Sequence, residues 1–195
     1  MFVFAHTGIG STLVRPWRKK LPRGMLLLGT LLPDLIDKSL YYGVVFLHRF
    51  DPGGLALISG TRTFGHTALF LLILSWIAVI RGSRSLAALA LGVATHLLLD
   101  GFADTFGPDV PGDGTASALL WPLTGWSFPW SPYGSLSEHL SAFAAPFFLW
   151  AEAIGIALLA LDFAESRMRR SKRGDLGPLA PVGGASSCQG EPSGR

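Results

Sequence analysis

Histidine and aspartate side chains recur within or at the ends of the apolar segments of this chain. The set that falls at helix-face spacings comprises His6, Asp34, Asp37, His66, His96, Asp100 and Asp104. Ionisable groups at membrane depth are costly and rare, so each of them is a candidate functional residue. Imidazole and carboxylate are also ligands that zinc and similar divalent ions take in proteins. The residue types therefore predict a metal centre.

The most compact motif is His96-x-x-x-Asp100, whose i,i+4 spacing places both side chains on one face of a helix. One helix can then supply two ligands to an ion, or a ligand and the carboxylate that orients it. The alternative is a buried polar pair that holds membrane helices together. Asp104, one further turn along, either continues the same face or begins the next loop.

A second motif, Leu-Pro-Asp-Leu-Ile-Asp at residues 32–37, places Asp34 and Asp37 three residues apart. Pro33 removes a backbone donor, so a kinked or broken helix is expected here. Broken helices in membranes tend to line polar cavities. Alternatively, the helix ends at the membrane interface, both carboxylates are solvated, and Lys38 pairs with one of them.

A third motif places Arg62 four residues before His66, followed by Thr67, at the start of an apolar segment. The guanidinium group offers a fork of donors suited to phosphate or carboxylate, and His66 could bind a metal. The alternative is an arginine that anchors the span at the interface, beside an ordinary polar histidine. A lone histidine near a helix end is more often structural, which makes His6 a weaker candidate.

The composition is that of a membrane protein. Of the 195 residues, 49% are hydrophobic and only 15% are charged, whereas soluble domains carry roughly 25% charged residues. Apolar runs extend over about 2–14, 24–47, 64–80, 86–103 and 141–162. Because a crossing takes about 20 apolar residues, we expect an all-α membrane bundle of about four to five spans within residues 1–165. Residues 166–195 read as a basic juxtamembrane segment and a disordered tail, and Glu152 in the last run needs a polar partner.

Basic residues gather in three clusters, at 15–23, 81–84 and 167–173. With five alternating spans all three clusters fall on one side, which the positive-inside rule makes the cytoplasmic side. The C-terminus is then expected in the cytoplasm, and the candidate ligands share one depth near the outer leaflet. Each cluster adjoins an apolar run, so we expect membrane lipids rather than nucleic acid as partners. In the alternative topology there are four spans, and the first run lies on the membrane surface.

Taken in order, the motifs resemble the YdjM-like family of bacterial and archaeal inner-membrane-associated proteins, described as membrane-bound metal-dependent hydrolases. That family shows an early histidine, a Leu-Pro-Asp segment with a further aspartate, Arg-x-x-x-His-(Ser/Thr), His-x-x-x-Asp and a Leu-Leu-Trp-Pro stretch. The matching residues are His6, Asp34 with Asp37, Arg62 with His66 and Thr67, His96 with Asp100, and residues 119–122. The second aspartate comes one residue later than in many relatives. The resemblance covers roughly residues 1–165 and implies a multi-pass protein of the inner membrane.

The leading hypothesis is a membrane-bound hydrolase that holds one or more divalent ions, with zinc as the best fit. The expected ligands are His66, His96, Asp100, Asp34 and His6. Asp37 is interpreted as a general base or an orienting residue, and Arg62 as a group that binds a substrate phosphate. More distantly, the pattern is similar to that of the zinc-dependent phospholipase C class, which suggests a phosphoester or lipid-linked substrate. The alternatives are a non-enzymatic membrane protein, such as a metal or ion transporter or an assembly factor, and a purely structural bundle.

Overall fold

The computed structural model describes residues 3–17, 20–47, 60–107, 115–128, 137, 141 and 144–174. These residues form helices and turns, and no β-strand occurs among them. The all-α prediction is therefore confirmed for this part of the chain. The chain divides into two compact units, residues 1–160 and residues 161–195. Within the predicted basic segment and disordered tail at residues 166–195, residues 166–174 are helical, and residues 175–195 lie outside the described residues.

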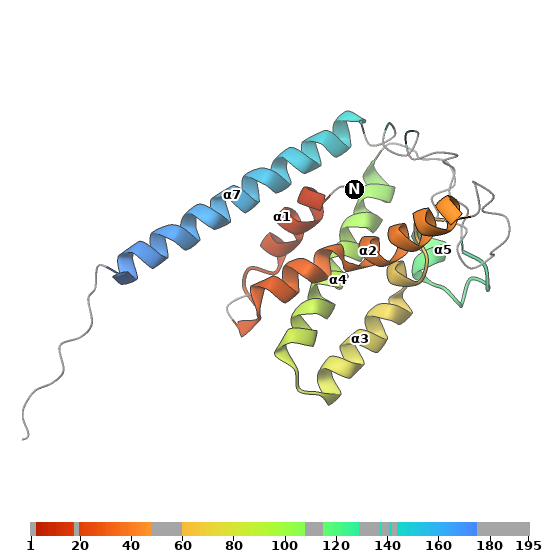
Figure 1. Cartoon of the computed structure of the whole chain (residues 1–195), viewed down its shortest axis with the longest axis horizontal. Coiled ribbons are helices and arrows are strands. Elements are labelled where there is room, and N and C mark those ends of the chain that lie inside the picture. The colour runs from red at the N-terminus through yellow and green to blue at the C-terminus, as the bar shows by residue number, and fades with distance from the viewer. Residues whose placement is uncertain are drawn as a thin grey trace, which may run out of the picture. The chain divides into compact units, whose positions relative to one another are not determined.

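Helices of very different length build the first unit (Figure 1). They are α1 (Val3–Leu13), α2 (Arg23–Leu47), the 3-10 helix η3 (Phe64–His66), α3 (Ala68–Ile80), α4 (Arg84–Phe106), α5 (Thr115–Leu119) and the start of α7 (Pro146–Gly174). The pair α2 and α4 makes the most extensive contact, while α1 packs on both of them and η3 packs on α2. The unit is thus organised around α2 and α4.

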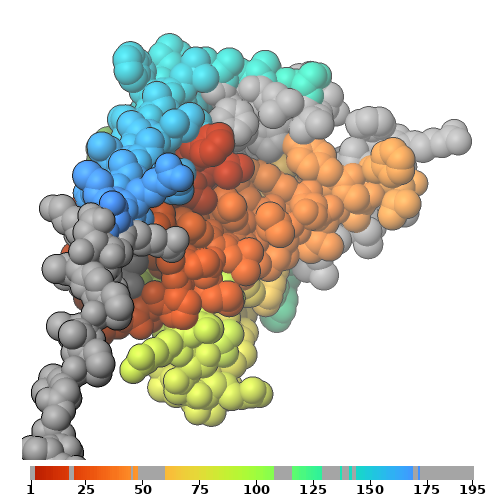
Figure 2. Space-filling model, turned by 60° about the vertical axis from the view of Figure 1, so that its left-hand side comes forward, coloured from red at the N-terminus to blue at the C-terminus, as the bar shows by residue number. Residues whose placement is uncertain are grey.

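The hairpin of α3 and α4 is set by local sequence. Thr67 caps α3 by accepting the Phe70 N–H at 2.9 Å, and Ser83 caps α4 by accepting the Leu86 N–H at 3.3 Å. Gly82 lies in the turn with a φ of 56°, a left-handed conformation that glycine adopts without strain. In Figure 2 this turn protrudes below α2 as a yellow-green lobe.

A pair of glycines lets α2 and α4 cross at very short distance. A Cβ atom at Gly29 would overlap the backbone of Leu89, and one at Gly92 would overlap the backbone of Leu26. Small residues allow membrane helices to approach in this way. The crossing brings α4 close to the stretch of α2 that follows Gly29.

A kinked or broken helix was expected at Pro33. The helix is not broken there, since α2 runs from Arg23 to Leu47 with Pro33 inside it. The backbone of η3 packs against this stretch so closely that a Cβ at Gly65 would lie 3.0 Å from the Pro33 carbonyl oxygen. The tertiary contact supports the helix where its own hydrogen bonding is interrupted.

Two helices are long and apolar enough to cross a membrane, Arg84–Phe106 and Pro146–Met168. The apolar helix α3 has only 13 residues, and α2 carries Asp34, Asp37 and Lys38 in its central part. The 11 residues of α1 rise by about 16 Å, well short of the ~30 Å hydrocarbon core. Two of the expected spans are therefore supported, and the full number of four to five is not confirmed.

Candidate metal centre

The residues singled out by the sequence meet in one cluster between α1, α2, η3 and α4. The cluster comprises His6, Asp34, Asp37, His66, His96 and Asp100. Five of these residues are at most 2% exposed, and the Asp34 side chain is 19% exposed. The ring of His96 lies next to both other imidazoles, with centroid distances of 3.9 Å to His6 and 5.1 Å to His66. Segments far apart in sequence thus bring their polar groups to one place.

Two imidazole nitrogens and two carboxylate oxygens converge at the centre of the cluster. Nε2 of His66 lies 3.2 Å from Nε2 of His96. Asp100 Oδ2 is 3.4 and 3.6 Å from these two nitrogens, and Asp34 Oδ1 is 3.5 and 3.9 Å from them. Ligand atoms placed tetrahedrally at about 2.0–2.1 Å from an ion lie roughly 3.3–3.4 Å apart. The observed separations are close to that value.

Both converging imidazoles are held through their other ring nitrogen. His96 Nδ1 donates to the Thr30 carbonyl oxygen at 2.8 Å, a contact that follows from the close crossing of α2 and α4. His66 Nδ1 lies 2.7 Å from Asp37 Oδ2 and donates to it. Because a carbonyl oxygen can only accept, His96 carries a proton on Nδ1 and, when neutral, presents a lone pair at Nε2. Partners of this kind orient metal-binding histidines in proteins.

Asp37 is fully buried and accepts hydrogen bonds on both oxygens. Its Oδ2 accepts the N–H groups of Thr63 at 2.7 Å and His66 at 3.2 Å, in addition to His66 Nδ1, and its Oδ1 accepts the Gly65 N–H at 2.9 Å. These hydrogen bonds hold the carboxylate against the His66 imidazole and the η3 backbone.

Arg62 faces two carboxylates and is only 8% exposed. Its Nη1 pairs with Asp104 Oδ2 at 2.8 Å, and its Nη2 lies 3.5 Å from Asp100 Oδ2. The guanidinium group therefore links Asp100 to Asp104, in addition to any contact with a substrate phosphate. Asp104 is the residue that the sequence motifs left undecided. Its signal was the spacing of four residues from Asp100, which continues the helix face that begins at His96.

The cluster reaches the surface at Asp34. Oδ2 of Asp34 pairs with Lys38 Nζ at 2.7 Å, one helical turn along α2, and the Lys38 side chain is 29% exposed. Oδ1 of the same carboxylate faces the imidazoles of His66 and His96. Asp34 thus connects the buried cluster with the protein surface, because one of its oxygens pairs with Lys38 while the other faces the two imidazoles.

His66 lies outside both candidate spans. Burial lowers the pKa of its imidazole, but hydrogen bonds to Asp100, Asp34 and Asp37 outweigh burial and raise the pKa to about 10. The surrounding carboxylates therefore favour a positive charge at this position. In the metal-free protein that charge is a proton on His66, and a divalent ion would take its place.

His6 is fully buried, with Nε2 3.3 Å from Asp100 Oδ1. Within the described part of the chain, neither of its ring nitrogens has a hydrogen bond of acceptable geometry. A buried polar group without a hydrogen bond is costly, and coordination of an ion would satisfy it. A ligand set of His6, His96 and Asp100 shares His96 with the set of Asp34, His66 and His96.

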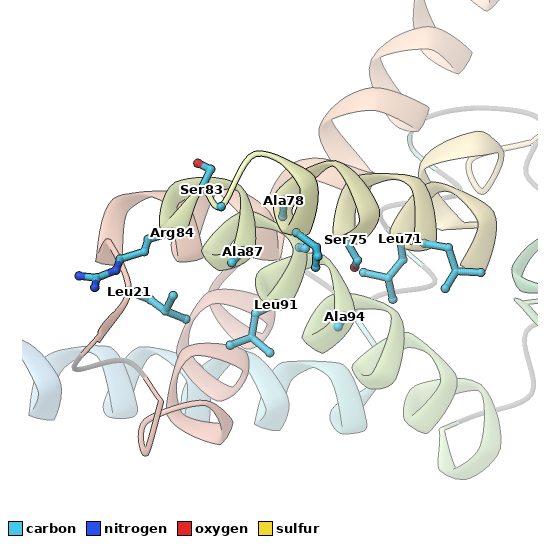
Figure 3. A pocket seen from close by; sticks show the side chains of 13 residues that line it. Leu21, Leu71, Ser75, Ala78, Ser83, Arg84, Ala87, Leu91 and Ala94 are labelled. Carbon is cyan, nitrogen blue, oxygen red and sulfur yellow. The ribbon is translucent and has the colours of Figure 1, made fainter.

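Two apolar cavities lie outside the cluster. One of about 540 Å³ runs along the α3–α4 hairpin and is lined mostly by leucine and alanine side chains (Figure 3). The other, of about 590 Å³, is lined only by apolar residues of α1, α4 and α7, among them Ile9, Leu99 and Trp150. Leu99 directly precedes Asp100, and Ile9 follows His6 by three residues. The second cavity therefore adjoins the helix segments that carry the cluster.

Of the comparisons with known proteins, the family comparison gives a match. No curated protein and no solved structure matches this chain. The family described as YdjM inner membrane protein matches residues 1–165, the range that holds every residue of the cluster and both crossing glycines. The match covers most of the 195 residues. The chain belongs to the YdjM inner membrane protein family.

Proposed function

We propose that this protein is a membrane-bound metal-dependent hydrolase whose ion is held in the His/Asp cluster. The observation that carries the proposal is the convergence of His66 Nε2, His96 Nε2 and the carboxylate oxygens of Asp34 and Asp100 at ligand spacing. Nitrogen and oxygen donors of this kind fit zinc, and a catalytic zinc ion takes three protein donors and keeps the fourth position for water. A bound ion would supply Lewis-acid chemistry, activating water and polarising the bond to be cleaved.

The remaining polar groups have supporting roles in this proposal. Asp37 and the Thr30 carbonyl orient the two imidazoles, and Arg62 balances the charge of Asp100. Asp34 has one oxygen towards the cluster and the other towards the partly exposed Lys38. The same carboxylate is thus placed to bind the ion or to carry a proton between the centre and the surface.

The proposed substrate is a phosphoester, and in particular a lipid-linked one. The apolar cavity of about 590 Å³ lined by α1, α4 and α7, whose helix segments include those that carry His6 and Asp100, has the volume of typical ligand pockets, roughly 300–1,000 Å³. Lys38 at the exposed end of the cluster carries a positive charge suited to a phosphate. A protein of the inner membrane also has lipid substrates at hand.

A transporter using the same residues is the alternative. A permeation path needs polar groups at successive depths, whereas hydrolysis needs one cluster with room for water. Among the described residues, the histidines all belong to the single cluster of His6, His66 and His96. This gathering supports hydrolysis more than transport.

The test measures zinc in the full-length protein purified in detergent. We expect stoichiometric zinc in the wild type, its loss in His96→Ala and Asp100→Ala, and its retention in Glu165→Ala, an acidic residue of α7 that belongs to neither candidate ligand set. Hydrolysis of a chromogenic phosphodiester and of a diacyl phospholipid is then compared with zinc flux into liposomes. Unchanged zinc in both cluster variants would refute the site. Flux without hydrolysis would instead support the transporter.

A further inference from the structure

The first turn of α1 is bound by a carboxylate from α7. Glu152 Oε1 accepts the N–H of Ala5 at 2.9 Å, and Glu152 Oε2 accepts the N–H of Phe4 at 3.1 Å. Amide groups in the first turn of a helix have no partner within the helix. Glu152 therefore caps α1 from a position 147 residues beyond Ala5 in the chain.

The cap also explains a charged residue inside an apolar helix. Glu152 lies within Pro146–Met168, one of the two candidate spans, where a carboxylate without a polar partner is costly. The amides at the start of α1 supply that partner, and the positive end of the helix dipole favours a negative charge there. The sequence showed that Glu152 needs a partner, and the structure identifies it.

Glycines lock α1 between its neighbours. A Cβ atom at Gly8 would overlap the backbone of Gly155 on α7. On another side of α1, a Cβ at Gly10 would lie 2.9 Å from Thr95 Oγ1 of α4 and 3.3 Å from Thr30 Cγ2 of α2. Contacts this close allow little rotation or sliding of α1. The position of α1 along its own axis is therefore defined by α7 on one side and by α2 and α4 on the other.

We propose that Glu152 is a positioning residue of the metal centre, which sets the place of His6 by capping α1. His6 directly follows Ala5, whose amide Glu152 binds, so a shift of the first turn moves the imidazole. That imidazole lies 3.3 Å from Asp100 Oδ1 and stacks beside His96. Glu152 contacts the first-turn amides of α1 and acts on the centre through His6. The role rests on the proposed metal centre.

The experiment is a double-mutant cycle on the full-length protein in detergent. Zinc affinity is measured by competition with a chromophoric chelator, and the absorption spectrum of the Co²⁺-loaded protein reports the ligand set. The variants are Glu152→Ala, Glu152→Gln, His6→Ala and the double variant His6→Ala/Glu152→Ala. Glu165→Ala, an acidic residue further along α7, is the matched control.

We expect Glu152→Ala and His6→Ala each to weaken zinc binding on the order of 10-fold and to change the Co²⁺ spectrum in the same way. The double variant should bind no more weakly than His6→Ala, because Glu152 acts through His6. Glu152→Gln keeps one acceptor oxygen and should fall between the wild type and Glu152→Ala. Amide exchange in the first turn of α1 should be faster in metal-free Glu152→Ala, and Glu165→Ala should match the wild type in every measurement.

A Glu152→Ala protein with wild-type affinity and spectrum would overturn the positioning role. So would a double variant whose loss equals the product of the two single losses. A wild-type protein that binds no zinc would overturn the proposed metal centre itself, and this role with it, which is a separate result. Circular dichroism and gel filtration establish whether the variants fold. If Glu152→Ala does not fold, Glu152→Gln is compared with the wild type instead.

Discussion

Asp37→Asn tests whether a buried carboxylate orients His66. The substitution keeps the size of the side chain but removes its charge and replaces one acceptor oxygen by an NH2 group. If the asparagine oxygen takes the place of Oδ2, which accepts from Thr63 and twice from His66, the NH2 group faces the Gly65 N–H. Two donors then face each other, and the buried Gly65 amide has no acceptor.

The expected cost follows from these contacts. A buried donor left without an acceptor costs about 1–3 kcal/mol, and each hydrogen bond to a charged acceptor loses about 1 kcal/mol when the acceptor becomes neutral. The easier burial of a neutral amide offsets part of the loss. We therefore expect the free energy of unfolding of the Asp37→Asn protein to fall by roughly 2–4 kcal/mol, and its zinc affinity to fall roughly 10–100-fold because His66 loses its orienting partner.

The assay compares Asp37→Asn with Asp34→Asn. Unfolding of the metal-free protein in detergent is followed by tryptophan fluorescence, and zinc affinity by chelator competition. The Asp34 side chain is 19% exposed and pairs with Lys38 as well as facing His66, so Asp34→Asn should lower zinc affinity while lowering the free energy of unfolding by less than Asp37→Asn does, because water reaches part of this side chain. Wild-type stability and affinity in Asp37→Asn would refute the orienting role. Equal losses of stability in the two variants would refute the assignment of the cost to buried acceptors.

Three further predictions address the helix crossing, the arginine link and protonation. Gly92→Leu places a side chain into the α2 backbone, so it should lower the melting temperature and abolish zinc binding. Gly101→Leu, with no atom near its Cβ, should change neither the melting temperature nor zinc binding. Similar behaviour of the two variants would contradict the argument that glycines permit the crossing. Asp104→Asn weakens the 2.8 Å ion pair with Arg62, so the guanidinium group should compete with zinc for the Asp100 carboxylate. Zinc affinity measured by chelator competition should then fall about 10-fold at unchanged helix content. An unchanged affinity would contradict the link from Arg62 to both carboxylates. The pKa of His66 is raised from 6.5 to about 10, so the stability that its proton gives the metal-free protein should be complete below pH 6.5 and disappear as the pH rises through about 10. Zinc binding at pH 7 should release that proton, and calorimetric binding enthalpies that do not vary with the buffer's ionisation enthalpy would contradict this.

Much of the candidate site was accessible from local sequence. The pairing of His96 with Asp100 on one helix face follows from helical periodicity, and so does the pairing of Asp34 with Lys38. The first pair was predicted because residues four apart on a helix are neighbours in any fold, whereas the pairing of Lys38 with one of the two aspartates was part of the alternative interpretation. A kinked or broken helix was predicted at Pro33; α2 is not broken there, and η3 packs against this stretch.

By itself, the sequence determined the residue types of the cluster, its helical framework and its membrane environment, because composition and periodicity are properties of the chain at short range. Only the tertiary structure decided the partners. Asp37 meets His66 across 29 positions of sequence, and Glu152 meets Ala5 across 147. Which donor reaches which carboxylate depends on where helices cross, and those crossings depend on glycine contacts between distant segments. The hydrogen bond between His66 and Asp37, the link from Arg62 to Asp104 and the cap on α1 therefore depend on how the helices pack together.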